Sequence, residues 1–184
     1  MAHGLVWEHH DEAVERFIEI YSMWGGVISG TVTWCRNGSG GNEAAVPVNE
    51  LLQQGERLGF TGGGDCHEGR VGFSCKDPDG QGATPHTFAA RLFYRCGLTA
   101  AKMPHLDRAN VIDALRQRRT YATTGARILL DFSAAGVPMG GEGAATEVTC
   151  HATVHAEGQI KRVEIIRNGT VAFSREFISA DLTL

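Results

Sequence analysis

The order of apolar and polar residues predicts alternating helices and strands in the first part of the chain. Residues 17–21 are rich in β-branched and aromatic side chains and predict a strand, after a short helical stretch over 11–16. Residues 47–52 place a proline at a helical first turn and apolar residues at helical spacing behind it. Residues 58–61 are a short apolar strand that ends at a run of glycines. This order of elements is typical of α/β folds, in which sites form at the carboxyl ends of strands.

A second helix is predicted further along, after an apolar stretch over 88–100 that suggests another strand. Asp107 is a suitable N-cap, and apolar residues at helical spacing follow it. A basic run closes this helix, where cations interact favourably with the helix dipole. We therefore interpret these arginines as a solvated helix end: Arg116, Arg118 and Arg119.

The pattern changes after Gly125 to the period of two that half-buried strands show. Residues 128–132 and 148–155 follow this period, and two more apolar segments flank Asn168-Gly169, a strong hairpin signal. We expect an α/β part over 1–126 and a β-rich, sandwich-like part over 127–184. The last strand-like segment runs to the end of the sequence, so either the β unit is small or the chain has been cut.

Composition and charge exclude some functional classes. The chain has 184 residues, a net charge of -4 and an isoelectric point near 6.0, so no basic field attracts nucleic acid or anionic membranes. No apolar run is long enough to span a bilayer, and no signal peptide is visible at Met1. The five cysteines form no CxxC pair, which favours reduced thiols and a cytoplasmic location unless an upstream signal is missing.

The strongest candidates for chemistry are Asp65 and His67, directly after the glycine run 62–64. Carboxylate and imidazole groups bind zinc, manganese or iron, and their position after a strand lets both converge on one ion cluster. The glycines permit close approach of backbone and substrate. The alternative is a glycine-rich turn with a solvated aspartate and histidine.

Glu19 is a further candidate because it lies within an apolar strand. A buried carboxylate is costly unless it is paired or bound to a metal. Glu19 is then either a metal ligand or a support for one, or it faces solvent on an edge strand. His151 and His155 share one face of a predicted strand with two threonines, which is typical of a solvated sheet face.

Segments along residues 5–140 together resemble an uncharacterised family of the polymerase and histidinol phosphatase (PHP) superfamily of metal-dependent phosphoesterases. The matching segments are 17–25, 55–60, 64–72 and 119–127. The resemblance implies a distorted β/α barrel that holds two or three metal ions, which polarise a phosphate ester and activate water. It implies Asp65, His67 and Glu19 as metal ligands, His3 as the remnant of an upstream histidine motif, and Arg70 as a substrate-binding residue.

The superfamily's H-x-H pair has no counterpart in this sequence. The expected fold is therefore α/β, the C-terminal portion of a PHP-type barrel followed by a small antiparallel β unit. The expected function is hydrolysis of a small phosphorylated substrate, with only part of the metal site present and metal binding incomplete. The alternative is an inactive fragment or binding module with a residual metal motif. Unpaired strand edges would favour homo-oligomers.

Overall fold

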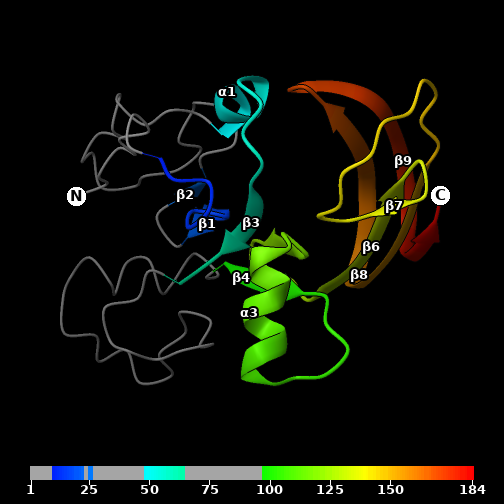
Figure 1. Cartoon of the computed structure of the whole chain (residues 1–184). Coiled ribbons are helices and arrows are strands. Elements are labelled where there is room, and N and C mark those ends of the chain that lie inside the picture. Colours follow the sequence, from blue (N-terminus) through cyan, green and yellow to red (C-terminus); the bar gives the residue numbers. More distant parts are fainter. Residues whose placement is uncertain (1–9, 23–24, 27–47, 65–96) are drawn as a thin grey trace, which may run out of the picture.

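The computed structural model describes residues 10–22, 25–26, 48–64 and 97–184 (Figure 1). Its elements group into an N-terminal three-stranded sheet, a two-stranded sheet and a C-terminal four-stranded sheet. In chain order they are β1 (Phe17–Ser22), β2 (Gly25–Gly26), α1 (Val48–Gln53), β3 (Gly59–Gly62), β4 (Leu98–Ala101), α3 (Arg108–Arg116), β5 (Thr120–Thr123), β6 (Ile128–Ala134), β7 (Val137–Pro138), β8 (Cys150–Arg167) and β9 (Thr170–Thr183).

The N-terminal sheet has the strand order β2-β1-β3, and β1 pairs with β3 in parallel. Its apolar side chains pack with the buried face of α1 in one small core, formed by Ile18, Val48, Leu51 and Leu58. The predicted strand at 17–21 and the predicted helix behind Pro47 are thus confirmed. Residues 11–16 form a single turn instead of a helix, in which the amides of Val14 and Glu15 donate to the Asp11 carbonyl.

The two-stranded sheet lies against β3, and small residues permit that close approach. Thr99 on β4 donates its hydroxyl to the Gly62 carbonyl at 2.7 Å and accepts from the Gly62 amide at 3.0 Å. A methyl group on Gly62 would lie 3.0 Å from the Leu98 carbonyl oxygen, closer than most side chains pack. The glycine at the end of β3 therefore also allows the two-stranded sheet to pack closely against this strand.

The predicted helix after Asp107 is confirmed as α3, with the Asp107 carboxylate accepting from the Asn110 amide at 2.8 Å. The N-cap keeps an extended backbone, as N-cap residues do, while its oxygen satisfies an otherwise unpaired amide of the first turn. α3 connects β4 to β5, and these two strands pair antiparallel.

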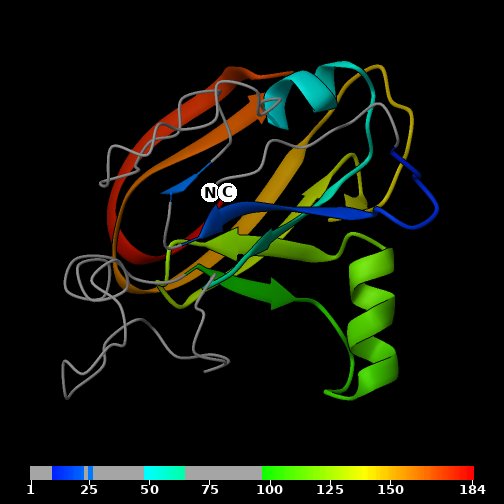
Figure 2. The same cartoon turned by 90° about the vertical axis from the view of Figure 1, so that its left-hand side faces the viewer.

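The C-terminal sheet is antiparallel, in the order β7-β6-β8-β9. The predicted hairpin is confirmed at Asn168 and Gly169, whose φ angles of 51° and 76° suit a tight turn between twisted strands. Strands β8 and β9 are long and strongly curved (Figure 2). The polar residues after His155 suggest the end of a strand, but they lie within β8, where the pairing with β9 shifts register between His155 and Ile160. The two strands predicted on either side therefore form one continuous strand.

The expected α/β barrel is wrong. About half of the described residues are strand and 13% are helix, and the described strands form three small sheets with no closed barrel. A β/α barrel needs parallel neighbours joined by helical crossovers. Here α3 joins antiparallel strands, and the pairing of β1 with β3 is the single parallel one among the described strands. The division at residue 126 stays a prediction.

No helix within the described ranges combines the length and the apolar character that a bilayer crossing requires.

Candidate functional site

The carboxyl ends of β1 and β3 meet at one edge of the N-terminal sheet. Glu19 lies opposite Thr61, and an irregularity then brings Tyr21 opposite Gly62. The Gly63 amide donates to the Tyr21 carbonyl at 2.9 Å, and the Gly63 carbonyl accepts from the Gly97 amide at 2.8 Å. The backbone at this strand end is therefore fixed on both sides, and it forms a rigid base for nearby side chains.

The Glu19 carboxylate lies directly against Gly63. A Cβ atom added to Gly63 would collide with Glu19 Oε2 and would lie 3.1 Å from Cδ. The side chain thus reaches along the sheet toward the end of β3, and only a glycine leaves it this position. Glu19 is exposed, so the argument from a costly buried carboxylate does not apply to it. Its oxygens remain suitable donors for a divalent cation.

The other predicted site residues lie outside the described residues: His3, Asp65, His67 and Arg70. Within the described part of the chain, no group of three or more acidic, histidine or cysteine side chains is arranged to hold a metal ion. The expected solvated histidine face is present, since His151 and His155 are exposed and His155 Nδ1 lies 2.6 Å from Asp181 Oδ1.

A second feature, which we call the Arg118 groove, lies between the α1–β3 segment and the C-terminal sheet. It has a volume of about 940 Å³, and its lining combines apolar side chains with arginines and glutamates. Arg118 and Thr120 line it from the segment between α3 and β5. The other lining residues include Leu58, Phe60, Phe132, Val148 and Ile165.

Arg118 is the least expected residue of the groove. Its side chain is only 11% exposed, and Nη2 donates to Glu142 Oε1 at 2.5 Å and to the Gly140 carbonyl at 3.3 Å. Arg57 Nη1 lies 3.1 Å from the second oxygen of the same glutamate. The interpretation of Arg118 as part of a solvated helix end is therefore wrong, whereas Arg116 is exposed as expected.

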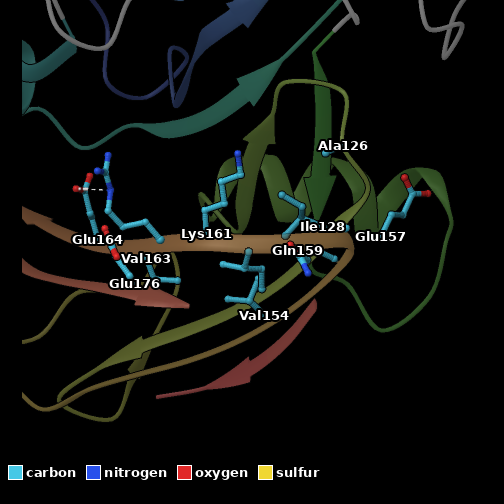
Figure 3. A pocket seen from close by; sticks show the side chains of 13 residues that line it. Ala126, Ile128, Val154, Glu157, Gln159, Lys161, Val163, Glu164 and Glu176 are labelled. Carbon is cyan, nitrogen blue, oxygen red and sulfur yellow. Dashed lines mark ion pairs between the residues drawn. The ribbon is translucent and has the colours of Figure 1, made fainter. Parts of the chain in front are cut away.

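A third feature is an open hollow of about 1110 Å³ along β8 (Figure 3). Its charged residues include Lys161 and the pair Arg162–Glu164, whose Nε and Oε1 atoms are 2.9 Å apart. Among the described side chains that line this hollow, none has a buried polar atom without a hydrogen-bond partner. The hollow is the larger of the two cavities, but the Arg118 groove carries the more specific chemistry.

Sequence reasoning missed Arg118 and Thr120 as candidates for binding. The basic run at 116–119 resembles any helix end, and burial of one member depends on how the distant C-terminal sheet packs. One local signal was available, because Arg118 follows the C-cap residue Gln117, at the position where glycine is usual.

Comparisons with known proteins place the sequence among relatives without a known role. The family model described as "Protein of unknown function (DUF3604)" matches residues 57–159. An uncharacterized protein of Chlamydia pneumoniae is 33% identical over 182 residues, which covers 92% of this chain and 27% of that protein. An uncharacterized protein of Chlamydia muridarum is 28% identical over 177 residues, with 90% and 27% covered. The chain spans about a quarter of the length of the curated relatives it matches. No solved structure matches it significantly.

These matches correct the resemblance to the PHP superfamily. The two most specific segments of that resemblance, around Asp65 and around Tyr121, both lie inside the matched range 57–159. Their pattern is therefore accounted for by a family of unknown function, and no PHP model matches. Short motifs of glycine, aspartate and histidine did not discriminate between the two families. With more than half of its residues matched, the chain belongs to the DUF3604 family of proteins of unknown function.

Proposed function

We propose that this chain contributes part of the site of a divalent-metal-dependent hydrolase of phosphate esters, with Glu19 as one metal ligand. The observation that supports this proposal is the Glu19 carboxylate seated over Gly63 at the end of two parallel strands. Asp65 follows Gly63 by two positions in the sequence, and His67 comes two positions later. The chain spans about a quarter of its relatives, so the activity is proposed for the longer protein.

The chemistry of these donors fits a hard or borderline divalent ion. Carboxylate oxygens and an imidazole nitrogen suit zinc, manganese or iron, and one carboxylate alone does not make a site. Glu19 would hold the ion from β1, and Asp65 and His67 are the proposed additional ligands. When bound, the ion would supply Lewis acidity toward a phosphate ester.

The remaining roles belong to the protein. The Glu19 carboxylate lies against Gly63, whose backbone is held by hydrogen bonds to Tyr21 and Gly97, so the surface beneath the carboxylate is fixed. Arg70 would orient the substrate, because a guanidinium group donates two parallel hydrogen bonds to phosphate oxygens. Cysteines without CxxC spacing fit a reducing, cytoplasmic location, which we propose together with the activity.

Hydrolysis of bis(p-nitrophenyl) phosphate by the purified chain tests the proposal. We expect slow turnover that requires added Mn²⁺ or Zn²⁺, stops with EDTA, and falls at least about tenfold in Asp65→Ala/His67→Ala and in Glu19→Gln. His151→Ala serves as a control, since it removes an exposed imidazole on β8 of the C-terminal sheet.

Turnover that survives EDTA, or that is equal in the double variant and the control, would contradict the proposal. Absence of turnover with either ion, both in this chain and in the longer protein, would favour the alternative of a non-catalytic binding module.

A further inference from the structure

Two residues that line the Arg118 groove each have a buried polar atom without a hydrogen-bond partner among the described residues. These atoms are Arg118 Nη1 and Thr120 Oγ1, and the Thr120 side chain belongs to a residue that is only 3% exposed. A buried donor without a partner costs free energy, more so when it is charged. Because both residues line the groove, a ligand seated there is a suitable partner for these atoms.

The backbone of Arg118 adds a second, independent observation. At the end of α3, the Arg119 amide donates a hydrogen bond to the Ala114 carbonyl at 2.9 Å, and the Arg118 amide donates to the Leu115 carbonyl at 3.1 Å. This pattern places Arg118 at the left-handed position where glycine is usual, and its φ angle is 57°. A side chain there is unfavourable, and strain of this kind is typical of residues kept for a function.

The surroundings of Arg118 hold it in this position. A Cβ atom on Gly59 would lie 3.0 Å from Arg118 Cα, and one on Gly140 would lie 2.8 Å from the Arg118 carbonyl oxygen. Two glycines thus leave room for the arginine backbone from opposite segments. With Nη2 occupied by Glu142 and the Gly140 carbonyl, Nη1 is the part of the guanidinium group left for a ligand.

The groove combines these donors with an apolar wall. Its volume of about 940 Å³ lies within the range for organic ligands. Phe60, Phe132 and Ile165 contribute apolar surface. The arginines that line the groove outnumber the glutamates by one: Arg57, Arg118 and Arg167 against Glu56 and Glu142. One net positive charge beside apolar walls complements a singly charged amphipathic anion.

We propose that the Arg118 groove binds a carboxylic acid with an apolar body, its carboxylate accepting from Arg118 Nη1 and Thr120 Oγ1. Two unsatisfied donors match the two oxygens of one carboxylate. A phosphate dianion would bring more charge and more acceptor oxygens than these groups satisfy, and it would lie near the Glu142 carboxylate. The groove does not include Glu19 or Gly63, so this inference is independent of the proposed hydrolase site.

Isothermal titration with decanoate, decanol and decyl phosphate tests this site on the full chain. We expect decanoate to bind at least about tenfold more tightly than decanol, as expected for hydrogen bonds to a charged group. Thr120→Val keeps the shape of the side chain and removes the hydroxyl. We expect it to weaken decanoate binding about tenfold while thermal stability stays equal or rises, because an unsatisfied buried hydroxyl is lost.

Three further variants separate direct contact from general charge effects. Arg118→Met should weaken decanoate binding about tenfold or more. Arg57→Met removes the same charge from a residue whose side chain is 58% exposed, and it should change the affinity less than about threefold. Glu142→Gln breaks the ion pairs but leaves Nη1 in place, and it should bind decanoate equally or more tightly.

Several results would overturn the assignment. Equal affinity for decanol, equal losses in Arg57→Met and Arg118→Met, or unchanged affinity in Thr120→Val would each exclude a carboxylate held by these atoms. Tighter binding of decyl phosphate than of decanoate would show that the ligand class is wrong. If Arg118→Met fails to fold, the Thr120→Val result alone decides, since that variant retains the ion pairs.

Discussion

Replacing Gly63 with alanine separates the role of Glu19 in metal binding from any role in stability. The new methyl group would occupy the space of Glu19 Oε2 and would lie 3.1 Å from Cδ. These atoms end an exposed side chain with several rotatable bonds, so the carboxylate can move away from the methyl group without a change in the backbone. The hydrogen bonds of the Gly63 amide and carbonyl involve only backbone and remain.

The magnitudes of the two effects differ strongly. An alanine at a compatible backbone position gains about 0.4–1 kcal/mol from the unfolded state, which offsets the displacement of the side chain. The free energy of unfolding should therefore change by less than about 1 kcal/mol. Metal affinity should fall about tenfold or more, because even the loss of a group that only supports a metal ligand typically costs 10–100-fold.

Urea denaturation and a Zn²⁺ titration on the same preparation measure both quantities. Gly158→Ala is the matched control, since a Cβ atom there meets nothing within 4 Å, and it should leave metal affinity unchanged. Unaltered metal affinity in Gly63→Ala would refute the reasoning. So would a loss of several kcal/mol in stability, which would show that the carboxylate is locked in place as a structural group.

Three other predictions concern stability and assembly. Gly140→Ala should lower the free energy of unfolding by roughly 2 kcal/mol or more, because the φ angle of Gly140 is 87° and the new methyl group would collide with the Arg118 backbone. A smaller loss, measured by urea denaturation, would contradict the close packing at Gly140. The Asn110 backbone amide lowers the pKa of Asp107 below its ordinary 3.8, so its contribution is complete above that pH and is lost as pH falls further. The excess melting temperature of wild type over Asp107→Asn should therefore shrink below about pH 3.8, and a constant difference would exclude this linkage. Ile178 is 86% exposed on β9, a long edge strand with one described neighbour, and such an edge can pair with a second copy of the chain. Sedimentation should therefore show dimers, and Ile178→Lys should weaken them. A strictly monomeric wild type would refute edge pairing.

Local patterns predicted individual elements better than their arrangement. The strand at 17–22, the helix capped by Asp107 and the hairpin at Asn168-Gly169 follow from propensity, capping and turn geometry. The prediction of a barrel was wrong, because the relative direction of strands depends on contacts between distant segments, which local patterns do not show. The antiparallel pairing of β4 with β5 around α3 shows this, since a strand–helix–strand order usually means a parallel pair.

The candidate site was predictable to a similar extent. The position of Glu19 beside the glycine run follows from the parallel pairing of β1 with β3, which the sequence order suggests. Its exposure and its contact with Gly63 depend on the irregular register after residue 19, which no pattern shows. The Arg118 groove depends on packing between segments far apart in the sequence, so no local pattern indicates it.

The central claim is that Glu19 is a metal ligand, and equilibrium dialysis with Zn²⁺ and Mn²⁺ tests it most directly. Glu19→Gln removes one charge at the strand end, and Glu147→Gln removes the same charge from an exposed residue before β8. The account predicts an affinity at least about tenfold lower in Glu19→Gln and unchanged in Glu147→Gln. Equal affinities in wild type and both variants would contradict it.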